Sequence, residues 1–218
     1  MIRGAIFDLD GTLLDSNPYW DRAPVVYLET LGKTAKDGIA QTIFAMTLPE
    51  AADYMIAEYE LSVPPQAVME GVNAAMERFY LHETPLKPGV GALLDLLRGR
   101  GIPCAVASVT DKYLVEAALR RHGMLDRFAH IVTTDDVGVG KQQPDVYLRA
   151  AELLGVQPDE TLVFEDALHA LQTAGRAGFR TVGVFDAASA ARQEALRSEA
   201  EFYLRDFSHL DALRAALS

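Results

Sequence analysis

The 218-residue sequence contains one cysteine, Cys104, so an intramolecular disulfide is excluded and a reducing compartment is the simplest setting. It has no apolar run of the roughly 18 to 20 residues that a membrane-spanning helix needs. Its first acidic residue, Asp8, comes too early to leave room for the apolar stretch of a secretory signal. Basic residues are scarce, with 20 Lys and Arg against 31 Asp and Glu and a net charge of −11. Nucleic acids and membranes are therefore disfavoured as partners, and we expect a cytoplasmic protein that binds a small molecule. The sequence indicates no oligomeric state.

Short apolar segments recur along the chain, and a helical pattern follows most of them. The predicted strands span residues 3–8, 102–107, 129–132, 161–164 and 180–184. This alternation predicts an α/β fold, with an open, Rossmann-like parallel sheet and helices on both of its faces.

The stretch 17–83 breaks this rhythm, because it contains helical patterns and no convincing strand. One predicted face carries Ala51, Met55 and Tyr59, and another carries Val68, Val72, Ala75 and Phe79. We interpret it as a helical bundle inserted after the first strand, so that residues 1–16 and 84–218 form the core domain.

Charged and polar side chains gather where the predicted strands end. They are Asp8 with Asp10, Ser108, Lys141 on a loop, and Glu165 with Asp166. Ligands of open α/β sheets bind at the carboxyl ends of the strands, so these side chains predict a site there. Each residue alone also has a simpler explanation, such as a turn, a helix cap or a solvated surface charge. The five histidines follow no metal-ligand spacing and are assigned to structure or solvent, His169 included.

Four segments together resemble the haloacid dehalogenase superfamily, in the right order and over nearly the whole chain. They are DLDGTLLDS at 8–16, Ser108, GKQQPDVYL at 140–148 and VFED at 163–166. The helical insert resembles the cap of the phosphoglycolate phosphatase and β-phosphoglucomutase-like branch. The resemblance implies a Rossmann-like core with that cap closing over the site.

The resemblance also implies the chemistry, which is removal of phosphate from a small phosphorylated metabolite. Asp8 would attack phosphorus and form an aspartyl phosphate. Asp10 would protonate the leaving alcohol and then deprotonate the attacking water. On an extended strand these two carboxylates, at positions i and i+2, would point the same way.

The implied ligands divide between a metal ion and the phosphate. For Mg²⁺ they are Asp8, the backbone carbonyl of Asp10, Glu165 and Asp166. For the phosphoryl oxygens they are Ser108 and Lys141. Magnesium suits an all-oxygen site of this kind.

The sequence departs from the family pattern at a few positions. Val109 follows Ser108 where a small polar residue is usual, and Gln142 stands where Pro is common. Ala167 and Ala170 replace the usual Ser and Gly, which puts the local backbone geometry in doubt.

One departure bears on the choice between hydrolysis and isomerisation. Mutases of this branch carry a histidine where this sequence has Trp20, and the basic cap residue they use is not evident at 47–51. The sequence therefore favours a phosphatase, with a β-phosphoglucomutase-like sugar phosphate mutase as the alternative. Hydrolytic dehalogenation is disfavoured by Asp10, and a non-catalytic binding role by the intact set of site residues.

The cap is expected to set substrate specificity, because it supplies the groups that face the leaving alcohol. Trp20 is the main candidate, with Tyr19, Phe44 and Met46 as further ones. Helical spacing makes cap core the simpler explanation for Phe44 and Met46.

Overall fold

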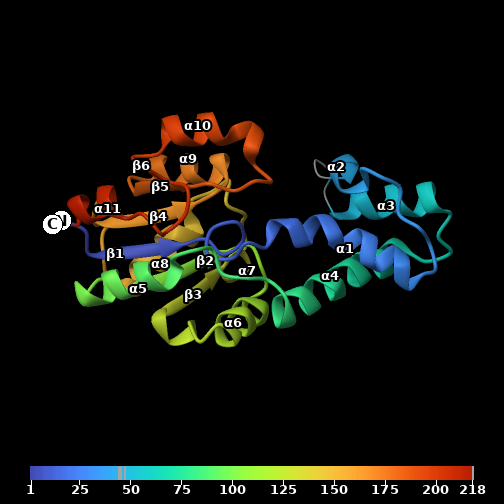
Figure 1. Ribbon diagram of the computed structural model, residues 1–218, viewed down its shortest axis with the longest axis horizontal. Coiled ribbons are helices and arrows are strands. Elements are labelled where there is room, and N and C mark those ends of the chain that lie inside the picture. The colour runs from blue at the N-terminus through green and yellow to red at the C-terminus, as the bar shows by residue number, and fades with distance from the viewer. Residues whose placement is uncertain (44–45, 47, 218) are drawn as a thin grey trace. The chain divides into compact units, whose positions relative to one another are not determined.

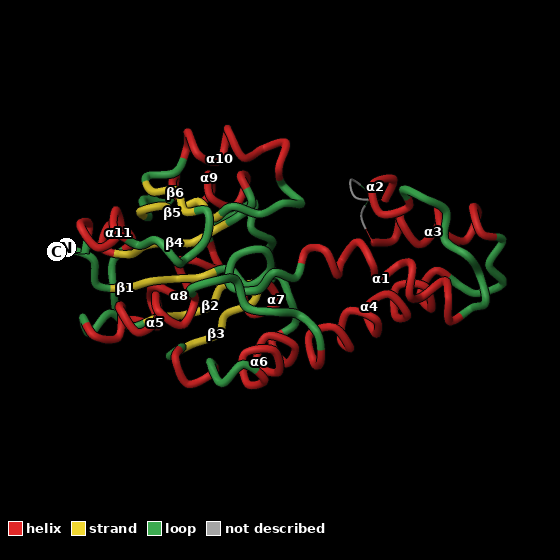
Figure 2. Tube along the Cα trace, viewed as in Figure 1, coloured by secondary structure: helices red, strands yellow, loops and turns green. Residues whose placement is uncertain are grey.

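The structure is a computed structural model that describes residues 1–43, 46 and 48–217. The chain divides into two compact units, one formed by Met1–Asp15 with Pro85–Ser218 and the other by Ser16–Thr84. The boundaries expected from the sequence lie one residue from these at each junction. Figures 1 and 2 show the elements of both units.

The first unit contains a six-stranded sheet in which every neighbouring pair is parallel. Its strands are β1 (Gly4–Phe7), β2 (Cys104–Ser108), β3 (His130–Thr133), β4 (Thr161–Glu165), β5 (Arg180–Val184) and β6 (Phe202–Leu204). They lie in the order β3-β2-β1-β4-β5-β6. The expected α/β Rossmann-like fold is confirmed. Strand β6 was not predicted, because three residues are too short to reveal a periodicity.

Helices lie on both faces of this sheet (Figure 1). They are α5 (Val90–Gly99), α6 (Lys112–Arg121), α7 (Thr134–Val137), α8 (Asp145–Leu154), α9 (Leu168–Arg176), α10 (Gln193–Glu199) and α11 (Asp211–Ala216). Three 3₁₀ turns, Leu125–Arg127, Pro158–Glu160 and Ala190–Arg192, complete the described elements of the unit.

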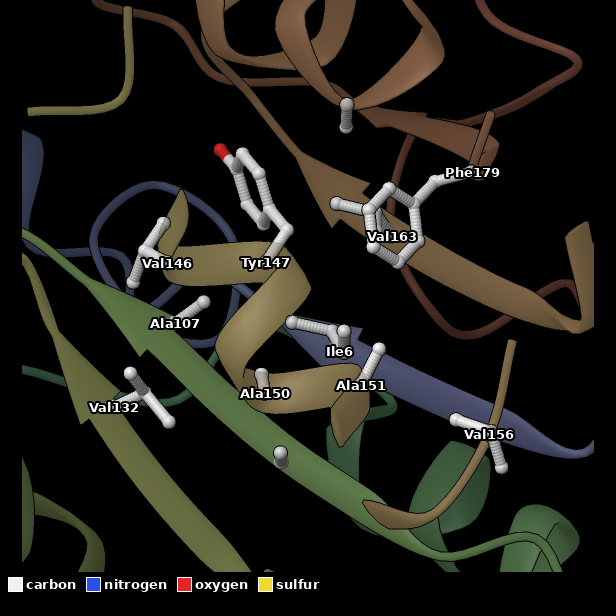
Figure 3. Close-up of a cluster of buried hydrophobic side chains, with 12 residues drawn as sticks. Ile6, Ala107, Val132, Val146, Tyr147, Ala150, Ala151, Val156, Val163 and Phe179 are labelled. Atoms are coloured by element: carbon white, nitrogen blue, oxygen red, sulfur yellow. The ribbon is translucent and has the colours of Figure 1, made fainter. Parts of the chain in front are cut away.

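Side chains on successive strand residues point to opposite faces, so the sheet has two cores. On one face Ile6 and Val163 pack in a buried cluster with Tyr147 and other α8 residues (Figure 3). On the other face the rings of Phe7 and Phe164 stack with their centroids 4.3 Å apart. Strand β1 is thereby buried on both sides, and the residue that follows it is held at a fixed place.

The strand order creates a switch point at β1. From β1 the chain proceeds to β2 and β3 on one side, and β4, β5 and β6 extend the sheet on the other. A crevice forms at the carboxyl ends of the strands where the winding direction reverses. The strand ends that flank it are those of β1, β2 and β4.

The second unit is helical in its described part. Its helices are α1 (Asn17–Thr30), α2 (Ile39–Ile43), α3 (Leu48–Tyr59) and α4 (Pro65–His82). Helix α4 packs against α1 and α3. The apolar faces predicted from the sequence are buried, at Ala51, Met55 and Tyr59 in α3 and at Val68, Val72, Ala75 and Phe79 in α4.

The two connecting segments are hydrogen-bonded to each other within the first unit. Leu14 and Leu86 form an antiparallel bridge. The backbone N–H of Asp15 donates to the carbonyl of Pro85 at 3.0 Å, and that of Lys87 donates to the carbonyl of Leu13 at 2.9 Å. No described helix is both long and apolar enough to cross a membrane.

Gly89 lies just after residues 85–87, the return segment by which the chain re-enters the first unit. Both its conformation and its surroundings require a glycine at this position. Its φ is +82°, and an added Cβ would lie 2.2 Å from the carbonyl carbon of Phe207. Gly101 has a similar φ of +69° but nothing within 4 Å of the Cβ position.

We predict that Gly101→Ala lowers the free energy of unfolding by about 1–2 kcal/mol, the cost of a left-handed alanine. Gly89→Ala should lower it clearly more, because backbone atoms of Phe207 must also move. Urea unfolding of both variants measures the difference, and equal losses would contradict the close contact.

Candidate active site

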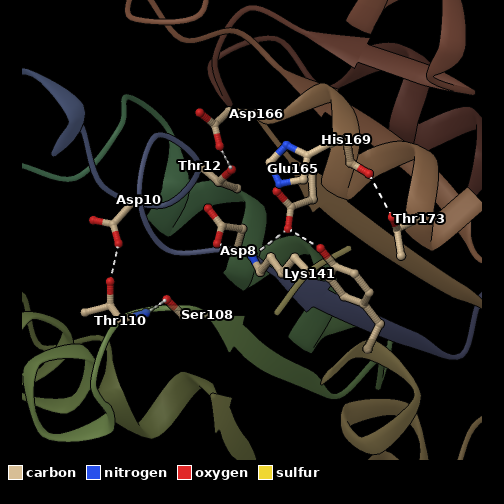
Figure 4. Close-up of polar contacts among 11 residues, drawn as sticks. Asp8, Asp10, Thr12, Ser108, Thr110, Lys141, Glu165, Asp166, His169 and Thr173 are labelled. Carbon is tan, nitrogen blue, oxygen red and sulfur yellow. Dashed lines mark hydrogen bonds and ion pairs between the residues drawn. The ribbon is translucent and has the colours of Figure 1, made fainter. Parts of the chain in front are cut away.

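The carboxyl ends of three neighbouring strands bring the site residues together (Figure 4). Asp8 directly follows β1, Ser108 is the last residue of β2, and Glu165 is the last residue of β4, with Asp166 after it. Lys141 reaches them from the loop between α7 and α8. The sheet topology therefore assembles side chains that lie up to 158 residues apart in the sequence (8 to 166).

Three buried carboxylates form an acidic cluster. Asp8, Glu165 and Asp166 each offer a carboxylate oxygen, and these oxygens lie within 4.8 Å of one another. The three residues are 5%, 1% and 6% exposed. A buried, all-oxygen set of carboxylates is the kind of donor set that a hard divalent cation prefers, so the cluster fits a metal ion.

Lys141 is the buried cation that faces this cluster. Its ammonium group forms ion pairs with Asp8 and with Glu165, the latter at 2.7 Å. Burial alone would lower the pKa of Lys141, but the charges of Asp8 and Glu165 outweigh it and raise the pKa. Lys141 therefore stays protonated and balances part of the negative charge.

Two hydroxyl groups not singled out from the sequence also contact the cluster. The hydroxyl of Tyr147 donates to Glu165 at 2.7 Å, and that of Thr12 donates to Asp166 at 3.5 Å. In the sequence, Tyr147 belongs to the segment 140–148 quoted for the family resemblance, which assigns no role to its hydroxyl. The signal that could have revealed it is a hydroxyl on a fully buried face, since such a group needs a hydrogen-bond partner.

Asp10 has a different set of contacts from Asp8. Its Oδ2 accepts a hydrogen bond of 2.6 Å from the hydroxyl of Thr110, and the backbone N–H of Thr110 donates to Ser108 Oγ at 3.0 Å. The strand ends at Phe7, so Asp10 lies in the turn that follows it. The expectation that the two carboxylates point the same way assumed an extended strand through Asp10; the strand ends earlier, and the two carboxylates have different partners (Figure 4).

Burial dominates the electrostatics of the cluster. It raises the pKa of Asp166 to about 7, with the neighbouring charge of Glu165 adding to the effect. Burial also raises the pKa of Asp8 well above its usual value; Lys141 opposes this, and the neighbouring carboxylates add to it. Without a further cation the cluster resists full ionisation near neutral pH.

A second buried ion pair lies after β5. Lys87 donates to Asp186 Oδ2 at 2.7 Å and to the carbonyl of Phe185 at 2.8 Å. Lys87 and Asp186 are 7% and 1% exposed. The pair therefore fixes the return segment to the side of the sheet where the strands have their carboxyl ends and the site residues lie.

The backbone at two of the departures from the family pattern is ordinary. Ala167 has an extended backbone with φ of −92°, and Ala170 is a buried helical residue of α9, so neither position needs a glycine. Val109 is 60% exposed. His169 is exposed, as its assignment to solvent requires.

The candidate specificity residues lie in the helical unit. Trp20 is 39% exposed on α1. The Tyr19 ring lies 5.0 Å from that of Phe79, and Met46 is half-buried. Phe44 lies outside the described residues.

Comparison with known proteins identifies the family. Residues 2–178 match the haloacid dehalogenase-like hydrolases. The chain is 29% identical to hexitol phosphatase B of Escherichia coli K12, covering 84% of this chain and 83% of that protein. It is 31% identical to fructose-1-phosphate phosphatase YqaB of the same organism, covering 83% and 95%.

A solved structure agrees over nearly the whole chain. CbbY from Rhodobacter sphaeroides, in complex with phosphate, superposes with a TM-score of 0.79 at 26% identity, covering 97% of each chain. The fold and the buried polar edge define a Rossmann-like α/β hydrolase. The chain belongs to the haloacid dehalogenase-like hydrolase family. Its named relatives support the expected enzyme class, a phosphoric monoester hydrolase.

The raised pKa of Asp166 predicts how the metal-free protein responds to pH. Between the usual value of 3.8 and about 7, the folded state binds more protons than the unfolded state. Stability without divalent cations should therefore fall as pH rises through that window. Thermal unfolding in chelator from pH 5 to 8 measures this, and Asp166→Asn should flatten the profile and raise the melting temperature at pH 8.

The matched control is Asp15→Asn, which removes the same charge at an exposed position of the neighbouring segment. It should leave the profile unchanged. A wild-type profile that rises over this range would contradict the role assigned to buried Asp166.

Proposed function

We propose that the protein is a magnesium-dependent phosphatase that hydrolyses a small phosphorylated metabolite through an aspartyl-phosphate intermediate. The observation that carries the proposal is the convergence of Asp8, Lys141 and two further carboxylates at one buried strand edge. Phosphoryl transfer requires a positioned nucleophile, charge neutralisation and a proton shuttle, and this edge offers all three.

Asp8 is the proposed nucleophile. It sits at the end of a strand that is buried on both faces, so its carboxylate is positioned by the sheet. Ion pairing with Lys141 favours the ionised form that attacks phosphorus, against the effect of burial. The product of attack is an acyl phosphate on Asp8, which water then hydrolyses.

Asp10 is the proposed general acid and base. It lies two residues from the nucleophile, and a separate contact to Thr110 holds it. It would give a proton to the leaving alcohol in the first half of the reaction and take one from water in the second.

Ser108 and Lys141 are the proposed phosphate ligands. Ser108 Oγ accepts from the N–H of Thr110, so its own O–H can donate to a phosphoryl oxygen. Lys141 would offer an ammonium donor to another of these oxygens.

Asp8, Glu165 and Asp166, with the backbone carbonyl of Asp10, are the residues that would hold Mg²⁺. The ion supplies positive charge that stabilises the transferring phosphoryl group. Tyr147 and Thr12 support this set by donating to Glu165 and Asp166.

The substrate class proposed is a phosphorylated sugar or polyol. The relatives named for hexitol phosphates and for fructose 1-phosphate support it. We propose the helical unit as the cap of the family and Trp20 as its specificity residue. Trp20, in place of the histidine that mutases carry, favours hydrolysis over isomerisation.

The proposal predicts that purified protein with Mg²⁺ releases phosphate from at least one member of a sugar and polyol phosphate panel. Asp8→Asn should lower kcat by at least about 10⁴-fold, because it replaces the nucleophilic carboxylate by an uncharged amide and leaves only binding contributions. Phosphate release measures both.

Asp15→Asn is again the matched control and should retain wild-type turnover. No release from any ester in the panel would contradict the proposal. Interconversion of sugar 1- and 6-phosphates without net phosphate release would favour the mutase alternative.

A second prediction concerns the metal. Mg²⁺ at a hundredfold excess over its dissociation constant should stabilise the wild-type protein by about 2.7 kcal/mol. Asp166→Asn should lose most of this gain, because one of the three clustered carboxylates is gone. Titration calorimetry and thermal unfolding with and without Mg²⁺ measure it, and an undiminished gain in the variant would place the metal elsewhere.

A further inference from the structure

The hydroxyl of Thr110 connects two residues of the proposed site. It donates to Asp10 Oδ2 at 2.6 Å, and the backbone N–H of the same residue donates to Ser108 Oγ at 3.0 Å. Figure 4 shows the carboxyl group of Asp10 directed toward Thr110. One residue therefore contacts both the proposed acid and a proposed phosphate ligand.

Thr110 is held on a rigid support. It is 6% exposed and follows β2 closely, where Ser108 pairs in register with Thr133 of β3. A threonine has a restricted χ1 angle because it is branched at Cβ, and burial restricts it further. Its hydroxyl thus occupies a defined position relative to the strand edge.

Asp10 lies in different surroundings from Asp8. It is half-buried and lies in a turn beyond β1, next to Gly11 with φ of +78°. Its carboxyl group is not part of the cluster of Asp8, Glu165 and Asp166.

We propose that Thr110 is a positioning residue for Asp10: the hydrogen bond between its hydroxyl and Oδ2 holds the carboxyl group in one orientation at the strand edge. This inference rests on the proposed phosphatase function. The contact can persist in both halves of the reaction, because the hydroxyl can donate to a carboxylate oxygen and accept from a protonated one.

The proton then follows a defined route. As Asp8 forms its bond to phosphorus, the bond from phosphorus to the ester oxygen breaks and that oxygen takes the proton from the Asp10 carboxyl group. Asp10 is left as a carboxylate that still accepts from Thr110. Water later attacks the phosphorus of the acyl phosphate, one of its protons passes to the Asp10 carboxylate, and the bond from phosphorus to Asp8 breaks.

The test compares two substrates that differ in their need for an acid. An alkyl phosphate leaves as a poor alkoxide and needs protonation, whereas p-nitrophenyl phosphate leaves as a stable phenolate and needs little. The ratio kcat/KM reports steps up to release of the leaving group, so it isolates the first half of the reaction.

We predict that Thr110→Val lowers kcat/KM for the alkyl phosphate by at least about tenfold, a fraction of the usual contribution of a general acid. The value for p-nitrophenyl phosphate should change far less. Thr110→Ser keeps a hydroxyl and should restore most of the loss.

The matched control is Thr161→Val. Thr161 is also buried and donates one hydrogen bond, to the carbonyl of Gln157 at 2.7 Å, but it lies at the opposite end of β4 from Glu165. It should leave both values of kcat/KM unchanged.

If Thr110→Val lowers kcat/KM equally for the two substrates, Thr110 has only a structural role and the inference is overturned. An unchanged or higher kcat/KM for the alkyl phosphate would overturn it as well. Absence of turnover by the wild-type protein on every ester would instead overturn the proposed function, and this inference with it. The two failures are therefore distinguishable.

Discussion

The contact of one buried ammonium group with a cluster of buried carboxylates is the interaction on which the site depends. Lys141 pairs with Asp8 and Glu165, while Asp166 completes the cluster. Three carboxylates face one ammonium group, so full ionisation of the cluster would leave negative charge in excess in an interior that solvates it poorly. Such an arrangement persists only because the buried sheet holds the side chains in place.

This excess charge explains the remaining features of the strand edge. Hydroxyl donors from Tyr147 and Thr12 partly solvate the carboxylates. The cluster is poorly suited to stabilising the empty protein but well suited to receiving a cation. Electrostatic repulsion between clustered side chains is typical of functional sites, where the fold holds together groups that would otherwise separate.

The sequence predicted the elements that depend on local patterns. The five longer strands and the helical stretch follow from apolar periodicity, and the site residues from their places at strand ends. The partners that only the folded chain brings together could not be predicted. Thr110 is hydrogen-bonded to Asp10, which lies 100 positions away in the sequence, and Lys87 is hydrogen-bonded to Asp186, which lies 99 positions away. Such pairs depend on sheet order and on side-chain direction, which no periodicity encodes.

The paired connecting segments have a consequence for how the helical insert can vary. The bridge between Leu14 and Leu86 places the points where the chain leaves and rejoins the sheet-bearing unit side by side. An intervening sequence of any length whose ends can approach each other fits there without altering strand register. The helical insert can therefore vary in length or sequence while the strand register of the first unit is kept.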